Sequence, residues 1–575
     1  MKANRTSFED GGTVLVCVVL LALGLELDVR AQSASSSLST VTATASRCTV
    51  GLLSAPRIKI TSADAAKSSE GTPRCVIYGE VPTEGEGAPP GLAHFRLDLP
   101  FQWNGKLVFD GGGGFDGFIR PPLPSVPAQG YATLSTDSGH SGGPDGASIG
   151  AKAMNSGWMT KAGEGRNEAA LADYLYRAIH QVRQTVSPIV AQFYGTSIRR
   201  SYFWGCSNGG REAMLNAMQN PEDFDGFIAG DPSIVPALGI QEIWKLKVLR
   251  DSNISYATLQ RVDAAVMEAC DSVDGVKDGL IQNPAACSFD FGTLVKGAML
   301  SSAQAEALIR YTSAIHDDVG AFIEPGGPIS AMSGSGRQEY TNGLPGYMID
   351  PVAKRSSESD AAFKNLIQYR TAVGLVGGIG FGDLSLDIFG PQIFDPGGII
   401  RHDAVTQVQK GWAPGIGDPS KMREFFRLNR KLIIYHGLAD HDTTPYESQL
   451  YYEALARANG GLLKIKRNAR LFLAPGMEHC QGGQGPNSFD PLEALDNWVG
   501  HGTAPAKIIA KKFVDDDPAL SLQRSMPLCP YPGIAHYDGH GNVNDWTSWA
   551  CIDSDSTLTR YGLIGRRAGL GDSWR

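Results

Sequence analysis

One segment, residues 202–214 (YFWGCSNGGREAM), constrains the fold of this chain more than any other. Its aromatic start suits a buried strand, and its apolar positions from Ala213 to Met218 have helical spacing. Between them stands Gly-x-Ser-x-Gly, in which glycines permit a sharp turn without a side-chain clash. The segment predicts a strand, a turn and a helix that hold the Ser207 hydroxyl at the carboxyl edge of a sheet. There the backbone N–H of Asn208 can point at an oxyanion.

Length and composition bound the class of protein. The chain has 575 residues, of which 42% are hydrophobic and 19% charged, and this predicts a globular protein with more than one domain. The net charge of -9, without a long basic run, argues against nucleic acid or an anionic membrane as the main partner. We expect a small or neutral substrate instead.

The N-terminus has the features of a secretory signal. Lys2 and Arg5 precede an apolar run at 13–25, which is short for a membrane span, and residues 29–31 (VRA) resemble a signal-peptidase site. We predict a signal peptide at 1–31 that is cleaved, a secreted or periplasmic location, and no membrane attachment afterwards. An uncleaved membrane anchor is the alternative.

The cysteines agree with export. Of the nine, Cys17 lies in the signal run, and the even number that remains suggests four disulfides in an oxidising compartment. Proximity in the sequence favours Cys48–Cys75, Cys270–Cys287 and Cys529–Cys551, which leaves Cys206 with Cys480 as one of 105 connectivities. That last pair adjoins Ser207 and His479, so a bridge would hold these two side chains near each other.

Strands and helices alternate before and after residue 207, and this predicts a mainly parallel sheet with helices on both faces. The expected strands are 76–81, 94–100, 106–109, 131–137, 202–206 and 226–230, with a long helix at 167–186. From 233 to 421 the alternation fades, and Gly, Pro and Ser separate short helical stretches at 304–315 and 359–372. We therefore predict an inserted lid domain at 233–421 between two parts of one domain, 32–232 and 422–575.

Aromatic residues of the predicted lid have two interpretations. They wall a pocket for an aromatic group, or they form the core of the lid itself. The residues concerned are Trp244, Tyr340, Tyr347, Phe381, Phe389 and Phe394.

The sheet resumes with two strands that each precede a candidate catalytic residue. Strand 431–437 ends in His-Gly-x-x-Asp and places Asp440 in the following loop, where a catalytic acid belongs; strand 470–474 delivers His479 into its exit loop. The order Ser207, Asp440, His479 is that of α/β-hydrolases, in which the acid orients the imidazole and stabilises its charged form. The rivals are Asp442 for the acid, and His140, His436 and His441 for the base.

A glycine loop at 110–117 (DGGGGFDG) follows the strand at 106–109. It could cradle phosphate, but no Gly-Lys-Ser/Thr and no dinucleotide fingerprint accompany it. An oxyanion loop is the better interpretation, because only glycine lets a backbone N–H approach a reacting carbonyl so closely. A flexible surface turn is the alternative.

An aspartate-rich segment lies within the predicted lid at 270–280 (CDSVDGVKDGL). Its carboxylates and two carbonyls could bind calcium, whereas Asp-Gly pairs are also ordinary turn formers. A Cys270–Cys287 bridge across the loop favours a structural metal. The expected ligands are Asp271, Asp274, Val276, Asp278 and Leu280.

Together these motifs resemble the tannase and feruloyl esterase family. The resemblance rests on the glycine loop and on 205–211 (GCSNGGR), 436–440 (HGLAD), 477–480 (MEHC) and 527–532 (PLCPYP), and it covers nearly the whole mature chain. It implies an α/β-hydrolase fold with a large inserted lid domain. It also implies a secreted serine esterase that cleaves esters of feruloyl, galloyl or mono(2-hydroxyethyl) terephthalate type.

The resemblance further implies particular residue functions. Ser207, Asp440 and His479 are the expected catalytic triad, beside a Cys206–Cys480 bridge, with calcium in the loop at 271–280. The expected oxyanion donors are the N–H groups of Asn208 and Gly114. Two alternatives stand beside this function: a serine peptidase of the same fold, and a catalytically inactive hydrolase domain that acts as a calcium-dependent binding protein.

Overall fold

The structure is a computed structural model that describes residues 40–144, 147–234, 238–250, 252–334, 343–347, 363–412 and 416–552. The described residues, from 40 to 552, belong to one compact unit. The predicted signal peptide at 1–31 lies outside the described residues. Within them, no helix combines the length and the apolar character that crossing a membrane requires.

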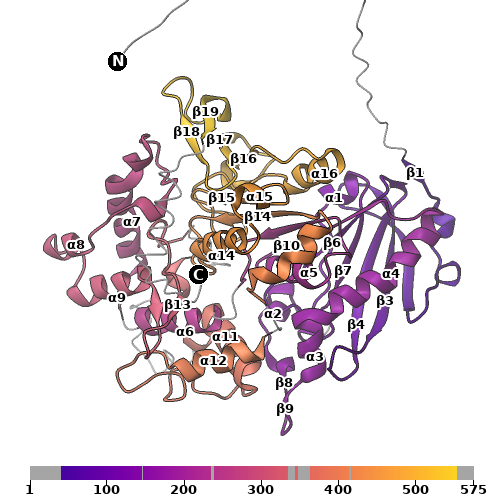
Figure 1. The fold of residues 1–575 in the computed structure, drawn as a ribbon, viewed down its shortest axis with the longest axis horizontal. Coiled ribbons are helices and arrows are strands. Elements are labelled where there is room, and N and C mark those ends of the chain that lie inside the picture. Colours follow the sequence, from indigo (N-terminus) through magenta and orange to yellow (C-terminus); the bar gives the residue numbers. More distant parts are fainter. Residues whose placement is uncertain are drawn as a thin grey trace, which may run out of the picture. The chain divides into compact units, whose positions relative to one another are not determined.

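A nine-stranded mixed sheet organises the described part of the chain (Figure 1). Strands β15, β14, β11, β10, β6 and β7 are neighbours in that order and run parallel. Antiparallel strands β4, β3 and β2 extend the sheet beyond β7. The bounds are β2 Lys59–Lys67, β3 Pro73–Thr83, β4 Gly91–Pro100, β6 Lys106–Asp110, β7 Ala132–Thr136, β10 Arg200–Cys206, β11 Gly226–Gly230, β14 Lys431–Gly437 and β15 Ala469–Ala474.

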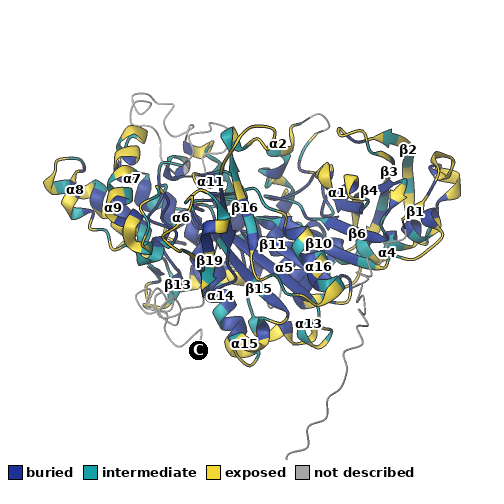
Figure 2. Ribbon diagram, turned by 90° about the horizontal axis from the view of Figure 1, so that it is seen from above, coloured by how far each residue is buried: buried dark blue, intermediate teal, exposed yellow. Residues whose placement is uncertain are grey.

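Alternation along the strands builds one core on each face of the sheet, because successive side chains point to opposite faces. Phe203 and Phe227 belong to the larger core, and Tyr202 and Ile228 to the smaller one. Figure 2 shows strand β11 and helix α5 largely in the colour of buried residues. The larger core includes side chains of α4 (Ala178–Tyr194), α5 (Asn208–Gln219) and α14 (Pro445–Ala458), and the smaller includes those of α16 (Pro491–His501). The predicted parallel sheet with helices on both faces is confirmed.

The helix predicted at 167–186 is longer than expected. It comprises α3 (Glu168–Ala172), a π-helical turn at 173–177 and α4, and it continues past Pro188 to Tyr194. Gly195 follows with φ of 74°, a left-handed conformation that ends helices and favours glycine. The buried side chains of α4 explain its length.

The segment between β11 and β14 adds helices and, in the described residues, no strand to the large sheet. Figure 1 shows α7, α8 and α9 gathered on the side away from β2–β4. The bounds are α6 Leu238–Leu249, α7 Tyr256–Cys270, α8 Gly292–Lys296, α9 Ser302–Thr312, α11 Ile367–Ala372, the π-helix η9 Val373–Phe381, α12 His402–Gly411 and α13 Arg423–Arg427, with a separate pair β12 Ile315–His316 and β13 Phe322–Glu324. The lid boundaries at 233 and 421 stay a prediction.

The C-terminal part completes the fold with two small antiparallel sheets. Strands β16 (Ile508–Phe513) and β17 (Leu522–Leu528) pair with each other, as do β18 (Ile534–Tyr537) and β19 (Trp549–Ile552). The side chain of Leu280 packs against Met526 and Trp549 of these sheets. The aspartate-rich loop is therefore attached to the C-terminal part of the chain.

Candidate active site

Ser207 stands on a sharp turn between β10 and α5. Its φ of 61° and ψ of -123° lie outside the regions that residues with side chains ordinarily adopt. The turn needs glycine at positions 205 and 210, on either side of Ser207. A Cβ on Gly205 would lie 2.4 Å from the backbone of Gly209, and one on Gly210 would lie 2.3 Å from Gly230 O. The Ser207 N–H donates to that same carbonyl at 3.0 Å, which ties the turn to β11. This is the strand, turn and helix that the sequence predicts.

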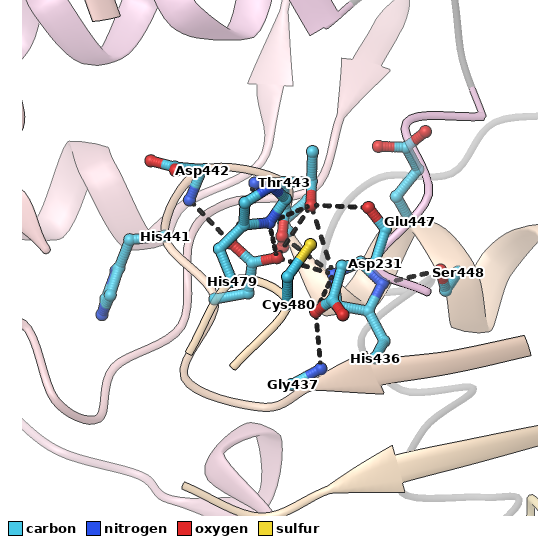
Figure 3. A network of polar contacts seen from close by, with 12 residues as sticks. Asp231, His436, Gly437, His441, Asp442, Thr443, Glu447, Ser448, His479 and Cys480 are labelled. Atoms are coloured by element: carbon cyan, nitrogen blue, oxygen red, sulfur yellow. Dashed lines mark hydrogen bonds and ion pairs between the residues drawn. The ribbon is translucent and has the colours of Figure 1, made fainter. Parts of the chain in front are cut away.

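The loops after β14 and β15 bring Asp440 and His479 into contact. His479 Nδ1 lies 2.7 Å from Asp440 Oδ2. The carboxylate is fully buried and is also fixed by the N–H groups of Asp442 (2.8 Å) and Thr443 (3.0 Å), and by the Thr443 hydroxyl (2.8 Å). Figure 3 shows Thr443 beside the His479 ring. The acid is thus held rigidly, and its partner imidazole is held with it.

A disulfide joins the serine turn to the histidine loop. Cys206 and Cys480 are bonded, with their Cα atoms 6.0 Å apart. Ser207 and His479, each next to one of these cysteines, line the same cavity of about 2650 Å³. The other three predicted bridges are also confirmed: Cys48–Cys75, Cys270–Cys287 and Cys529–Cys551.

Burial and charge oppose each other at the His479–Asp440 pair. Burial favours the neutral form of each group, but their mutual attraction outweighs it. That attraction holds the pKa of Asp440 well below its usual range and raises the pKa of His479, to which the charges of Asp442 and Asp231 contribute. The site therefore stabilises an imidazolium, which is the form a general base reaches after it has taken a proton.

The rival histidines do not line the cavity. His436 is fully buried, with Nδ1 2.8 Å from Ser448 Oγ and Nε2 3.2 Å from Asp440 Oδ2, so it contacts the acid but not the cavity. His441 contacts Tyr311 and backbone carbonyls and points away from His479 (Figure 3); burial lowers its pKa to about 4. His140 Nε2 lies 2.9 Å from Phe115 O. The rival acid Asp442 does line the cavity, but its own N–H donates to Asp440.

Asp231 belongs to this site although sequence reasoning did not assign it there. It follows β11 and is fully buried; its Oδ1 accepts the N–H of Gly437 at 2.9 Å, and its Oδ2 lies 3.5 Å from Cys206 Sγ. Burial raises its pKa to about 7. The sequence did contain a signal for Asp231. It follows a strand, as Asp440 does, and both strands end at this edge of the sheet.

The glycine loop after β6 forms another wall of the cavity through Gly113 and Gly114. Gly114 has φ of 57°, and a Cβ there would lie 2.6 Å from Ala153 O, so a side chain is excluded. Among the described residues, its N–H has no hydrogen-bond acceptor. Asn208, the first residue of α5, lines the same cavity.

Of the two interpretations of the aromatic residues at 233–421, the described residues support a core: Tyr347 and Phe394 are buried in the larger core. The cavity is lined by none of the described members of this set, which are Trp244, Tyr347, Phe381, Phe389 and Phe394. Tyr340 lies outside the described residues. Phe389 instead packs near Phe363 and Tyr369, with ring centroids 6.1 and 6.4 Å apart. The residues of the predicted lid on the wall are Ser233, Leu238, Glu242, Ile367, Gln368, Arg370, Thr371, Leu375 and Trp412. Trp412 is the aromatic residue that sequence reasoning missed, because spacing does not show which ring faces the cavity.

The aspartate-rich loop is built on hydrogen bonds to its own backbone. Asp271 Oδ1 accepts the N–H groups of Gly279 (3.0 Å) and Leu280 (3.2 Å), and Asp274 Oδ1 accepts that of Val276 (3.0 Å). Burial, with the charges of its neighbours, raises the pKa of Asp274 to about 6. Hard oxygen donors with unbalanced negative charge fit calcium in their chemistry. In the described residues, however, the three carboxylates do not converge within 4.8 Å, so binding would require them to exchange backbone partners.

Comparison with solved structures identifies the fold. The structure aligns with a crystal structure of feruloyl esterase B from Aspergillus oryzae at a TM-score of 0.70 and 20% identity, covering 88% of this chain and 100% of that one. It aligns with tannin acyl hydrolase from Aspergillus niger at a TM-score of 0.66 and 19% identity, covering 91% and 97%. The predicted α/β-hydrolase fold is thus confirmed.

Sequence similarity then gives the family. Residues 75–552 match the family model "Tannase and feruloyl esterase", and the chain belongs to that family. It is 28% identical over 547 residues to mono(2-hydroxyethyl) terephthalate hydrolase from Piscinibacter sakaiensis, covering 85% of this chain and 87% of the relative. It is 29% identical over 475 residues to a probable feruloyl esterase from Arthroderma benhamiae, covering 79% and 81%. The protein is a carboxylic ester hydrolase.

Proposed function

We propose that this chain is an exported serine esterase that cleaves esters of aromatic acids with Ser207, His479 and Asp440. One observation carries the proposal: the hydrogen-bonded Asp440–His479 pair is linked by the Cys206–Cys480 disulfide to the turn that bears Ser207. A covalent link of this kind restricts the distance between nucleophile and base, and such restriction lowers the entropic part of the barrier.

Acylation follows from the proposed assignments. Nε2 of His479 takes the hydroxyl proton of Ser207 while Oγ bonds to the ester carbonyl carbon. The oxyanion that develops accepts hydrogen bonds from the N–H groups of Asn208 and Gly114. The C–O bond to the alcohol then breaks, and the imidazolium returns its proton to the departing oxygen. Asp440 stabilises that imidazolium throughout.

Deacylation repeats these steps with water. His479 takes a proton from a water molecule whose oxygen bonds to the acyl carbon, and the same two N–H groups donate hydrogen bonds to the new oxyanion. The bond to Ser207 Oγ then breaks, and the imidazolium protonates the serine. The products are the aromatic acid and the free enzyme.

The lid wall supports an aromatic acyl group as the substrate. Leu238, Leu375 and Trp412 give an apolar surface for a planar ring, and Arg370 brings a guanidinium to the same wall. Arg370 Nη2 donates to Met154 O at 2.9 Å and keeps further donors for an acidic ring substituent. This cation favours esters of carboxylated aromatic acids, the type that the name of the Piscinibacter sakaiensis relative describes.

Calcium and export complete the proposal. Calcium would be held by Asp271, Asp274 and Asp278 with the carbonyls of Val276 and Leu280, and it would supply charge neutralisation that stabilises the loop. The four disulfides and the sequence pattern of 1–31 support a secreted or periplasmic location.

The proposal is tested by hydrolysis of an ester panel. Purified mature chain is assayed with methyl ferulate, methyl gallate, mono(2-hydroxyethyl) terephthalate and a short aliphatic p-nitrophenyl ester. We expect turnover of at least one aromatic ester, its loss in Ser207→Ala, and its retention in Ser125→Ala, a matched change on the same cavity wall. Equal turnover by Ser207→Ala, or no turnover of any ester, would refute the assignment.

Neither alternative function gains a specific observation. The relatives are named as esterases and hydrolases of esters, which does not favour a peptidase. Ser207, Asp440 and His479 are all present and adjoin one cavity or one another, which does not favour an inactive binding domain.

A further inference from the structure

Two buried carboxyl groups, Asp116 and Glu212, lie directly behind the glycine loop and are not used by the proposed reaction steps. Asp116 is 0% exposed and Glu212 is 2% exposed. Asp116 comes two residues after Gly114, and Glu212 lies one turn into α5 from Asn208. The pair therefore joins the two segments that carry the proposed oxyanion donors.

Each carboxyl group accepts one N–H of the glycine loop. The Gly112 N–H donates to Glu212 Oε2 at 3.0 Å, and the Gly113 N–H donates to Asp116 Oδ1 at 2.8 Å. Both N–H groups are thus directed at the carboxyl pair. The next N–H along the chain, that of Gly114, has no acceptor among the described residues.

The same network fixes Asn208. Its Nδ2 donates to Asp116 Oδ1 at 2.9 Å, the atom that also accepts the Gly113 N–H. On its other side, the Tyr174 hydroxyl lies 3.0 Å from Asn208 Oδ1 and 3.1 Å from Gly114 O, either of which can accept its hydrogen. The positions of the two proposed donors consequently depend on one set of hydrogen bonds.

The loop passes so close to the pair that side chains at positions 111 and 112 would not fit. A Cβ on Gly112 would lie 2.3 Å from Asp116 Oδ1, and one on Gly111 would lie 3.0 Å from Glu212 Oε2. Burial and the neighbouring Asp116 raise the pKa of Glu212 well above its usual range, which favours the protonated form of Glu212. Protonated Glu212 is then a donor to Asp116 and an acceptor for Gly112.

We propose that Asp116 and Glu212 are positioning residues of the oxyanion site: they hold the N–H groups of Gly112 and Gly113 away from the substrate, so that those of Gly114 and Asn208 face one oxyanion. The inference rests on the proposed function, since it concerns the same reaction. A site aimed at the oxyanion acts on the transition state more than on the bound ester, so its loss lowers kcat and leaves KM nearly unchanged.

The test compares two substitutions of Glu212 on one aromatic methyl ester that the wild-type chain hydrolyses. We expect Glu212→Leu to lower kcat by about 10²–10³, the loss on removal of one oxyanion donor, with KM within about threefold. Glu212→Gln keeps the acceptor for Gly112 and donates to Asp116 as the protonated acid does, so its kcat stays within about threefold. Asp317→Leu is the matched control: Asp317 is 5% exposed, accepts the N–H groups of Val319 and Ala321 and does not line the cavity, so its loss leaves kcat unchanged.

A second deletion keeps the test valid if Glu212→Leu does not fold. Asp116 has φ of 47°, which glycine tolerates, so Asp116→Gly removes the carboxylate without backbone strain and should give the same loss of kcat. Retention of kcat in the deletion variants, or equal losses in Glu212→Leu and Glu212→Gln, would overturn the inference while the esterase proposal stands. Failure of the wild-type chain to cleave any ester would overturn the esterase proposal itself.

Discussion

Two aspartate-rich loops of this molecule, 440–443 and 271–280, use the same local hydrogen bonds with opposite electrostatic results. In the first, Asp440 Oδ1 accepts backbone N–H groups from residues two and three positions later. In the second, Asp274 Oδ1 and Asp278 Oδ1 each accept the backbone N–H of the residue two positions later. Yet the pKa of Asp440 lies well below its usual range, whereas the pKa values of Asp274 and Asp278 are raised.

The difference comes from the cations that face each loop. His479 contacts Asp440 directly, and Lys245 Nζ donates to the carbonyls of His441 and Asp442. The loop at 271–280 has one close guanidinium, that of Arg524, 3.2 Å from Asp278 Oδ2. Carboxylates with similar local hydrogen bonds are therefore neutralised by an internal cation in the first loop. Those of the second loop lack sufficient positive charge nearby. The first loop has its cation within the chain, and we expect the second to gain stability from an added cation.

The largest effect is expected where the first loop loses its charge. Asp440→Asn keeps the shape of the side chain but removes the charge that stabilises the imidazolium of His479. We expect kcat to fall by about 10⁴, as for the loss of the acid in a Ser-His-Asp triad. Steady-state hydrolysis of the preferred aromatic ester measures it.

Asp442→Asn is the matched control for this change. Asp442 lines the cavity but does not contact the His479 ring through a hydrogen bond in the described residues, and we expect its maximal kcat to stay within about threefold of wild type. If Asp442→Asn lost as much activity as Asp440→Asn, Asp440 would be assigned wrongly as the catalytic acid. The comparison of the two loops would then no longer rest on Asp440.

An intermediate effect is expected on stability when calcium is added to the second loop. If calcium binds there, it adds about 2.7 kcal/mol to the free energy of unfolding at a concentration 100 times its Kd. The unfolding temperature should then rise with calcium and fall with a chelator. Scanning calorimetry of the oxidised chain measures both changes.

Asp274→Asn tests the direction of the change in stability. It removes one charge from a crowded set, so in chelator the variant should be at least as stable as wild type, and in calcium it should gain less. Asp290→Asn, a change at an exposed aspartate with its own backbone bond to Gly292, should respond to calcium as wild type does. A wild-type unfolding temperature independent of calcium would contradict the metal site.

Much of the fold was predictable because its strands are either apolar or strictly alternating. The buried runs that became β6, β10, β11 and β14 have no other stable location than a sheet interior. Strand β2 was not predicted, since its sequence KITSADAAK lacks that pattern. It forms because its backbone pairs with β3 at the sheet edge, and side chains contribute little to that pairing.

The candidate site was predictable where it depends on strand ends and unpredictable where it depends on packing. Asp440 and His479 each follow a parallel strand, and carboxyl ends of parallel strands share one edge. The same rule would have found Asp231, which follows β11. Trp412 could not be found in this way, because which aromatic ring of the lid faces the cavity depends on how its helices pack.

The smallest expected effect is a shift of the pH profile, and it measures how strongly the first loop favours a cation. His479 must be neutral to accept the Ser207 proton, so kcat/KM should rise with pH through the pKa of His479. Burial alone would lower that pKa, but Asp440, with Asp442 and Asp231, raises it, so the rise should lie above pH 6.5.

Asp442→Asn removes one of those charges and leaves the Asp440–His479 hydrogen bond in place. The charged form of Asp442 favours the imidazolium of His479. The variant should therefore have a lower His479 pKa and a pH profile displaced to lower pH. The pH dependence of kcat/KM for both proteins measures the displacement. Since the loop at 271–280 does not face His479, Asp274→Asn should leave the profile in place. An unchanged profile in Asp442→Asn would mean that Asp442 is neutral in the free enzyme, and that His479 owes its raised pKa to Asp440 and Asp231 alone.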